Sequence, residues 1–261
     1  MPPRGFAILI GAGPTSGAGI ARVLADPAQG NLAVALLARN KENLTSLCAE
    51  LRQSLDNKGV LHPFPCDTSP ANLRRVFGEI STHPDFRDLR LRLSVFHVKH
   101  ALKKPVLETP PEEFERNVAA YTTGAFAFAQ ESLRLFYGGR GAGEPTPLSA
   151  DNPGKKGTIV FTGTLGAMRT NAEYAAYGAG RSAVRMVAQA VGKEHGRYGV
   201  HVVHAIANGG IRDVSAERDE DVRAGKAMSA ESVGRLYLWL SELPPDLWVD
   251  ELDMRPAQEK W

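Results

Sequence analysis

The chain reads Gly11-Ala12-Gly13-Pro14-Thr15-Ser16-Gly17-Ala18-Gly19 directly after an apolar run, Phe6 to Ile10, and just before a helical pattern, Ile20 to Asp26. Glycines let the backbone turn tightly off a strand and approach a diphosphate, and the amides that open the helix then face the anion. A glycine-rich turn alone also fits an ordinary strand-to-helix corner. Here a second apolar run, Leu32 to Ala38, follows closely and completes the context that a dinucleotide site requires. We therefore interpret the turn as a dinucleotide-binding loop.

The composition is that of a soluble globular protein. The 261 residues fit a single α/β domain, 1–261, and contents of 43% hydrophobic and 23% charged residues allow a sizeable core. The formal net charge of +2 is spread along the chain, which argues against a nucleic-acid partner. No apolar run is long enough to span a bilayer, and the N-terminal run has no signal-peptide layout. We expect a cytoplasmic protein without a membrane partner.

The cysteine content excludes several kinds of site. The chain has two cysteines, Cys48 and Cys66. Two cysteines form neither a disulfide framework nor a plausible metal site, and both are expected to be small core residues. We predict no metal centre.

Apolar runs alternate with helical patterns along the chain. The predicted strands are 6–10, 32–38, 60–65, 91–98, 157–163 and 199–207. The predicted helices are 17–26, 41–56, 69–80, 111–137 and 174–197, and Pro70 and Pro111 suit first-turn positions. This alternation predicts a Rossmann-type doubly wound parallel sheet with helices on both faces. The polar run 138–156 is expected to be a surface loop without a catalytic role, because ligands bind at the carboxyl ends of the strands.

The ends of the second and third strands indicate which cofactor binds. Arg39 and Asn40 stand where a dinucleotide fold reads the adenosine ribose, and a guanidinium there can pair with a 2′-phosphate. The alternative for Arg39 is a solvated side chain that starts the next helix. Asp67 and Thr68 close the third strand, where a carboxylate can accept from the adenine amine or cap the following helix. These positions predict NADP(H).

With these motifs in place, the chain resembles the short-chain dehydrogenase/reductase family over nearly its whole length. The glycine motif reads Ala12-Gly13-x-x-x-Gly17-x-Gly19, and the family's Tyr-x-x-x-Lys motif reads Tyr177-Gly178-Ala179-Gly180-Arg181. Thr164 stands thirteen residues before Tyr177, where the family has its serine. The tail LWVDELDMRP, 247–256, resembles a divergent branch that often departs from the usual catalytic tetrad.

Three further family motifs are altered. The Asn-Ala-Gly turn after the fourth strand reads His97-Val98-Lys99, and the asparagine of the catalytic helix aligns with Tyr121. The Pro-Gly after the sixth strand reads Asn208-Gly209, followed by Gly210-Ile211. Together with the loop, the resemblance implies these cofactor contacts: Gly13, Thr15, Ser16, Gly17, Gly19, Arg39, Asn40, Asp67, Thr68, His97, Tyr177, Arg181, Gly209 and Ile211.

The resemblance also implies catalytic roles for Thr164, Tyr177 and Arg181. In typical members the tyrosine protonates the substrate oxygen, the lysine binds the nicotinamide ribose and lowers the tyrosine pKa, and the serine orients the carbonyl. Here Thr164 keeps a hydroxyl, and Arg181 supplies a cation that cannot exchange a proton. Tyr121 cannot hold the water that the family's asparagine anchors. The electrostatic part of the site is therefore expected to persist, and the proton relay to be weakened.

Each of these residues also has a structural interpretation. Tyr177 can pack on Tyr174, Arg181 can reach solvent or pair with a carboxylate, and Thr164 can simply end a strand. His97 is expected near the cofactor ribose. The basic cluster Lys99, His100, Lys103 and Lys104 can flank the pocket or form a solvated loop.

The segment expected to cover the substrate, about 208–230, includes the charged span Arg212 to Ala227. A charged lid closes poorly over an apolar ligand, so we expect an open pocket or a loop that is disordered without a partner. A weakened relay suits imine or iminium reduction, because an iminium ion accepts hydride without a donated proton. Divergent family members occur in secondary metabolism. The leading prediction is an NADPH-dependent reductase of a small carbonyl or imine.

The alternative function is an NADP(H)-binding protein without net redox chemistry, as a guide for cyclisation or isomerisation, a sensor or an inactive partner subunit. The family resemblance also implies a homo-oligomer, a dimer or tetramer, formed through the helices 111–137 and 174–197.

Overall fold

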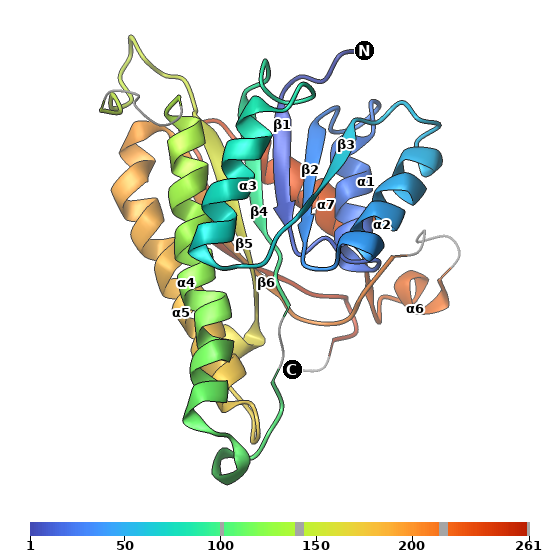
Figure 1. Cartoon of the computed structure of the whole chain (residues 1–261), viewed down its shortest axis with the longest axis vertical. Coiled ribbons are helices and arrows are strands. Elements are labelled where there is room, and N and C mark those ends of the chain that lie inside the picture. The colour runs from blue at the N-terminus through green and yellow to red at the C-terminus, as the bar shows by residue number, and fades with distance from the viewer. Residues whose placement is uncertain (100–101, 139–143, 214–218, 260–261) are drawn as a thin grey trace.

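Strands and helices alternate along the chain in the computed structural model, which describes residues 1–99, 102–138, 144–213 and 219–259 (Figure 1). The strands are β1 Phe6–Ile10, β2 Ala33–Ala38, β3 Leu61–Pro65, β4 Leu91–Phe96, β5 Gly157–Thr164, β6 Val200–Ala207, β7 Ile211–Arg212, β8 Met228–Ser229 and β9 Glu251–Met254. The α-helices are α1 Ser16–Ala25, α2 Lys41–Ser54, α3 Pro70–Thr82, α4 Pro111–Phe136, α5 Ala175–His195, α6 Glu220–Arg223 and α7 Ala230–Glu242.

Seven strands form one parallel sheet in the order β3-β2-β1-β4-β5-β6-β9. Helices α3, α4 and α5 cover one face, and α1, α2 and α7 cover the other (Figure 1). The strand order reverses between β1 and β4, where ligands of open α/β sheets bind at the carboxyl ends. This is a Rossmann-type, doubly wound fold, as the sequence predicted.

Strands β1 and β2 are apolar on both faces, which explains their unbroken hydrophobic runs. In β1, Phe6, Ile8 and Ile10 pack against the α3–α5 layer, while Ala7 and Leu9 pack against the α1–α7 layer. A parallel strand that is buried on both sides has no polar alternation. Cys48 and Cys66 are buried and free, as expected of core residues.

The six predicted strands and five predicted helices are present with small shifts at their ends. The fourth strand ends at Phe96 rather than at 98, because His97 turns toward the glycine loop. The sequence analysis missed helix α7 and the edge strand β9, which has four residues, one of them buried. An edge strand that short gives little periodic signal.

The loop 138–156 joins α4 to β5 as predicted, and its residues 139–143 lie outside the described part of the chain. The same holds for 214–218 within the expected lid. Among the described residues, no helix has both the length and the apolar character needed to cross a bilayer.

Candidate active site at the carboxyl edge of the sheet

The predicted site residues converge because they follow parallel strands. The glycine loop follows β1, Arg39 follows β2, Asp67 follows β3 and His97 follows β4. Thr164 ends β5. Since all these strands are parallel, their carboxyl ends form one edge of the sheet, and the side chains after them lie along that edge.

Close backbone packing defines the turn of the glycine loop. Gly11 has φ +91°, and a Cβ on it would lie 2.2 Å from the carbonyl oxygen of His97. A Cβ on Gly17 would lie 2.9 Å from the Cα of Ala12. On Gly13 a Cβ would meet nothing closer than 4.0 Å, so space remains open beside the loop at that residue. The turn is therefore compact inside and accessible at the start of α1.

The remaining residues of the loop have different surroundings. Thr15 precedes α1 and is exposed, and Ser16 opens the helix. Gly19 is buried, and a Cβ there would lie 2.4 Å from the Cβ of Ala230 in α7. Gly19 thus allows α1 and α7 to pack closely, and it lies away from the open side of the loop.

After β2, the two residues predicted to read the ribose are both exposed. Arg39 leaves its guanidinium accessible, and its charge contributes to a lowered pKa of Asp67. The side-chain oxygen of Asn40 accepts from the backbone N–H of Asn43, 2.7 Å away, and so caps α2. Arg39 is therefore the accessible cation at the position where a 2′-phosphate was predicted.

Asp67 fixes the start of α3. Its Oδ1 accepts from the backbone N–H and hydroxyl of Ser69, at 2.9 and 2.6 Å, and from the side chain of Asn72 at 3.0 Å. The hydroxyl bond from Ser69 is the main reason that the pKa of Asp67 is lowered. Thr68 packs on Gly124 of α4. The N-cap residue of α3 is Ser69 rather than Asp67, which instead holds Ser69 by these hydrogen bonds, and the adenine role of Asp67 stays a prediction.

A chain of hydrogen bonds leads from the glycine loop into the core. Ser16 Oγ is 2.6 Å from Nε2 of His97, and Nδ1 of His97 is 2.9 Å from Oγ1 of Thr162. The same Thr162 oxygen lies 2.7 Å from the hydroxyl of Tyr237, which is fully buried. These hydrogen bonds end at the buried Tyr237 and position the loop against β4 and β5.

Burial and the charge of Arg181 lower the pKa of His97 to about 4. The imidazole is therefore neutral near neutral pH, and one ring nitrogen donates while the other accepts. A neutral imidazole suits its place between two hydroxyls. The structure gives His97 a positioning role at the loop.

Thr164 and Tyr177 form a hydroxyl pair. Their side-chain oxygens are 2.9 Å apart, and Thr164 Oγ1 also accepts from the backbone N–H of Gly166 at 3.2 Å. Tyr177 contacts Tyr174 edge-on, with ring centroids 5.8 Å apart. Two of the purely structural roles that the sequence allowed are therefore observed, since Thr164 ends β5 and Tyr177 packs on Tyr174. Both residues nevertheless keep their hydroxyls together.

Arg181 is buried, with 3% of its surface exposed, so it does not reach solvent, and no carboxylate in the described part of the chain pairs with it. Its guanidinium donates to the carbonyl oxygens of Thr162 and Val98, at 2.8 and 3.0 Å. The guanidinium carbon lies 5.2 Å from the ring centroid of Tyr177 and 4.6 Å from that of Tyr121. Arg181 therefore links β5 to the turn after β4 and places a positive charge beside the hydroxyl pair.

Tyr121, which the family resemblance aligns with a water-anchoring asparagine, is a buried aromatic residue. The residue is 0% exposed, and its ring contacts that of Tyr177 edge-on with centroids 6.1 Å apart. A Cβ on Gly180 would lie 2.6 Å from the Tyr121 ring, so the glycine provides room for it. The volume behind Tyr177 is filled by this ring.

The basic cluster of the sequence analysis is partly neutralised. Lys103 pairs with Glu173 at 3.3 Å and Lys104 with Glu113 at 2.7 Å. Lys99 is exposed, and His100 lies outside the described residues. These pairs favour the interpretation as a solvated loop.

The segment after β6 forms the last part of the edge. Gly209 has φ +129° and packs on Pro256, and Ile211 is half-buried in β7. Asp213 accepts from Arg22 of α1 at 2.9 Å, so the start of the expected lid is tied to the helix that follows the glycine loop.

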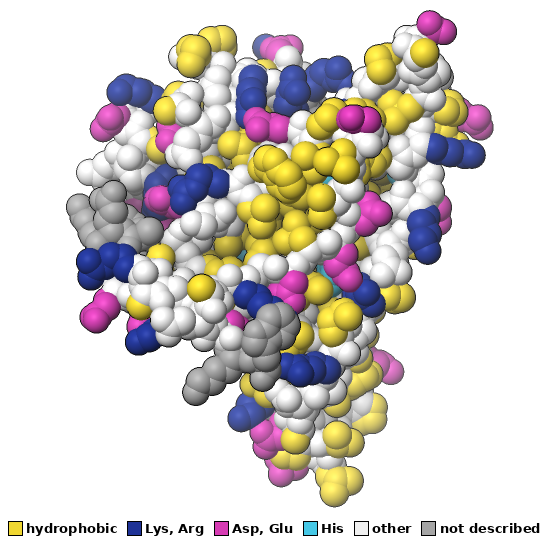
Figure 2. All heavy atoms as spheres, turned by 180° about the vertical axis from the view of Figure 1, so that it is seen from behind, with side chains coloured by type: hydrophobic (Ala, Val, Ile, Leu, Met, Phe, Trp, Pro, Cys, Tyr) yellow, Lys and Arg dark blue, Asp and Glu magenta, His cyan; other side chains and the backbone are white. Residues whose placement is uncertain are grey.

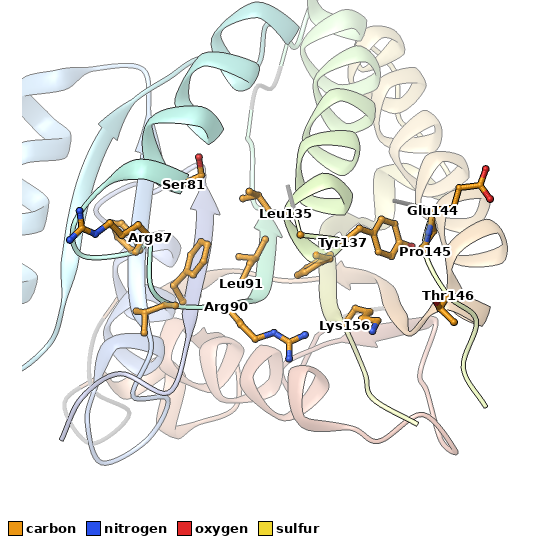
Figure 3. A pocket seen from close by; sticks show the side chains of 15 residues that line it. Ser81, Arg87, Arg90, Leu91, Leu135, Tyr137, Glu144, Pro145, Thr146 and Lys156 are labelled. Atoms are coloured by element: carbon orange, nitrogen blue, oxygen red, sulfur yellow. The ribbon is translucent and has the colours of Figure 1, made fainter. Parts of the chain in front are cut away.

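A cavity of about 750 Å³ lies at the other edge of the sheet, near the amino ends of β1 and β4. Figure 3 shows Leu91, Leu135 and Tyr137 around it, with Arg90 and Lys156 nearby. Part of the loop 138–156 contributes to its wall. None of the predicted site residues lines this cavity.

Sequence reasoning missed two residues of the carboxyl edge, Thr162 and Tyr237. Thr162 lies two residues before Thr164 on the same face of β5, so strand periodicity could have identified it. Tyr237 lies on α7, which the sequence analysis did not predict, and no sequence signal placed it under the loop.

A family model described as Enoyl-(Acyl carrier protein) reductase matches residues 13–240, which include most of the glycine loop, the hydroxyl pair and Arg181. The chain belongs to the short-chain dehydrogenase/reductase family. It is an oxidoreductase family, and its members act on small-molecule substrates and often form oligomers. No curated protein gives a significant match to this chain.

Solved structures of the family superpose on nearly the whole chain. A short-chain dehydrogenase from Rhodopseudomonas palustris is 25% identical with a TM-score of 0.75, covering 98% of this chain and 100% of that one. An alcohol dehydrogenase from Thermococcus sibiricus, complexed with 5-hydroxy-NADP, is 17% identical with a TM-score of 0.75 and 98% coverage of both chains. An NADPH-bound short-chain oxidoreductase from Pseudomonas aeruginosa PAO1, with an atypical catalytic center, is 15% identical with a TM-score of 0.76, covering 98% and 97%.

Proposed function

We propose that this chain is an NADP(H)-dependent oxidoreductase that reduces a small carbonyl or an imine/iminium compound with an altered catalytic tetrad. One observation carries the proposal. The hydroxyls of Thr164 and Tyr177 lie 2.9 Å apart beside the guanidinium of Arg181, on the edge that also bears the glycine loop.

The residues at the loop fit a dinucleotide. The first amides of α1 have no intrahelical acceptor, and the open side of the loop at Gly13 leaves room for a diphosphate. Arg39 stands exposed after β2, where a guanidinium can bind a 2′-phosphate. Solved relatives with bound NADP or NADPH support this choice of cofactor. When bound, NADPH supplies the hydride.

The hydroxyl pair would serve the acceptor atom of the substrate. Tyr177 would donate a proton to a carbonyl oxygen while Thr164 orients that oxygen by a hydrogen bond. A phenol is a weak proton source at neutral pH, and a nearby cation stabilises the phenolate left behind. Arg181 provides that cation at the ring of Tyr177.

The buried ring of Tyr121 is the reason that imines are among the proposed substrates. It fills the volume behind Tyr177, in the position where the family resemblance places a water-anchoring asparagine. Replacement of the tyrosine proton is then slow. An iminium carbon accepts hydride without a proton from the protein, so its reduction is not limited by that step. The atypical catalytic center of the Pseudomonas aeruginosa relative is a precedent within the same fold. A place in secondary metabolism would suit such a substrate.

The experiment is a reductase assay with purified protein, NADPH and a panel of ketones, aldehydes and cyclic imines. Oxidation of NADPH is followed by the loss of its near-ultraviolet absorbance. We expect turnover of at least one imine, with matching formation of amine. NADPH binding without turnover of any carbonyl or imine would contradict the reductase proposal.

That outcome would favour a second candidate, an NADP(H)-binding protein without net redox chemistry. One observation supports it. The guanidinium of Arg181 already donates to two backbone carbonyls, which is a structural role that needs no substrate. A protein that guides a cyclisation would keep the loop and this cross-link.

Assembly and the lid complete the proposal. Phe126 on α4 and Met186 on α5 are exposed by 51% and 49%, which favours a homo-oligomer, a dimer or tetramer, formed through these neighbouring helices. Light scattering of the purified protein measures its oligomeric state.

We also assign 208–230 as the substrate-side lid, tied to α1 by Arg22 and Asp213.

A further inference from the structure

Three side chains with metal-ligating atoms meet at the edge of the sheet opposite to the glycine loop. His62 is the second residue of β3, His83 caps the carboxyl end of α3, and Asp85 follows two residues later. The two imidazoles are half-buried, and 41% of the Asp85 side chain is exposed. The cluster is therefore reachable from solvent and takes no part in the proposed reductase site.

The ligand atoms have the spacing of a metal site rather than that of hydrogen bonds. Oδ2 of Asp85 lies 3.7 Å from Nδ1 of His62 and 3.8 Å from Nδ1 of His83. Hydrogen bonds between nitrogen and oxygen span about 2.7–3.2 Å, so the carboxylate oxygen bonds neither ring. Two atoms bound tetrahedrally to one Zn²⁺ at about 2.0–2.1 Å are roughly 3.4 Å apart. One ligand atom from each residue lies within 4.8 Å of the others.

We propose that His62, His83 and Asp85 bind a divalent transition-metal ion of the zinc type. Two imidazoles and one carboxylate are donors that Zn²⁺ accepts, and water would complete the tetrahedron. Small movements of the three side chains close the spacing from 3.7–3.8 Å to the bound distance. The exposed Asp85 side chain can make most of that movement.

The tautomer of His83 is suited to bind metal. Its Nδ1 accepts from the backbone N–H of Asp85 at 3.2 Å, so the lone pair resides on Nδ1 and the proton on Nε2. This nitrogen is also the one that faces the Asp85 carboxylate. A metal ion would replace the weak N–H contact without a change of tautomer.

Aromatic packing holds the two imidazoles in place before any ion arrives. The rings of His62 and His83 are 4.0 Å apart between centroids. Phe64 packs at 4.9 Å from His62 and 5.6 Å from His83, and Phe86 packs at 5.6 Å from His83. Because Phe64 and Phe86 belong to the core, the ligands lose little side-chain freedom on binding.

The local field also favours a cation. His83 directly follows the last turn of α3, at the negative end of the helix dipole. Arg52 is a cation near His62, and its guanidinium donates to the carbonyl oxygen of Leu61. An ion here would tie the start of β3 to the connection between α3 and β4. The sequence analysis predicted no metal because it considered the cysteines, and His62 and His83 are separated by a whole helix.

The test uses tag-free full-length protein, treated with EDTA and dialysed, then titrated with Zn²⁺ by calorimetry and thermal denaturation. We expect one equivalent to bind and the melting temperature to rise. His62→Gln and His83→Gln should each weaken binding by about tenfold or more, with Asp85→Asn weakened in the same direction. Asp88→Asn is the matched control, since Asp88 is 83% exposed, pairs with Arg87 and should leave binding unchanged.

Co²⁺ provides a second measurement, because it accepts the same donors and a tetrahedral site gives it visible absorption. We expect that absorption in the unaltered protein and its loss in the double variant His62→Gln/His83→Gln. Circular dichroism of the metal-free variants checks that they are folded. Absence of stoichiometric Zn²⁺ binding, or unchanged Zn²⁺ affinity in the folded double variant, would overturn the proposal. Neither result bears on NADPH binding, so the two proposals fail separately.

Discussion

The glycine loop, residues 11–19, and the hydroxyl pair of Thr164 and Tyr177 lie on one edge of the sheet, but different parts of the chain hold them. Backbone contacts fix the loop, because a Cβ on Gly11 would collide with the His97 carbonyl. Side chains fix the hydroxyl pair, through Arg181 and the buried ring of Tyr121. The two regions are joined by His97 and Thr162.

The difference in how the two regions are held corresponds to a difference in how closely each resembles the family's motifs. The loop retains the glycine pattern of its family, as backbone geometry requires. In the hydroxyl region, the buried side chains of Arg181 and Tyr121 fill the space together. We therefore expect this protein to bind its cofactor while its proton chemistry differs from that of a typical family member.

The largest effect is expected at the hydroxyl pair. Tyr177→Phe removes the proposed proton donor, and general acid catalysis contributes about 10²–10⁴-fold. We expect carbonyl reduction to fall by a factor in that range, while iminium reduction stays nearly unchanged. Steady-state kinetics with one carbonyl and one N-alkylated cyclic iminium ion measure both rates, because that cation needs no proton before it accepts hydride.

Tyr174→Phe is the matched control, because Tyr174 contacts Tyr177 edge-on without sharing the Thr164 hydrogen bond. It should leave both rates within about a factor of two. Equal survival of both activities in Tyr177→Phe would show that the phenol donates no proton.

The second-largest effect tests whether close backbone contacts determine the conformation of the loop. Gly11→Ala places a Cβ 2.2 Å from a backbone oxygen at φ +91°. Left-handed strain and overpacking together cost about 2–5 kcal/mol of unfolding free energy. Urea denaturation measures the loss. Gly78→Ala in α3, where a Cβ meets nothing within 4 Å, should instead stabilise the helix by up to about 1 kcal/mol. Similar effects at both glycines would contradict the close approach.

The third effect concerns the residue that joins the two regions. The pKa of His97 is lowered from 6.5 to about 4, so the unfolded chain takes up a proton at a higher pH than the folded chain does. Stability therefore falls as the pH drops from 6.5 through 4, by roughly 2–3 kcal/mol from this group. In His97→Asn, this part of the pH dependence should disappear. Urea denaturation across that pH range gives the difference, and parallel curves for both proteins would refute the assignment.

The sequence could predict the fold and the edge of the site, because apolar runs and the glycine turn report on the backbone. It placed Thr164, Tyr177 and Arg181 on the same edge from the family spacing. The sequence could not predict which groups the guanidinium of Arg181 would contact, since that depends on which carbonyls a long side chain can reach. The partners of His97 were also hidden, because Tyr237 comes from a helix distant in sequence. His62 and His83 meet only when the chain is folded.

The smallest effect is the most direct test, because the proposed selection of NADP(H) depends on the exposed guanidinium of Arg39. Calorimetric titration with NADPH and with NADH should show tighter binding of NADPH in the unaltered protein. Arg39→Ala should weaken NADPH binding by about 1.5–3 kcal/mol and leave NADH binding nearly unchanged. No heat with either cofactor, or equal losses for both in Arg39→Ala, would contradict this account.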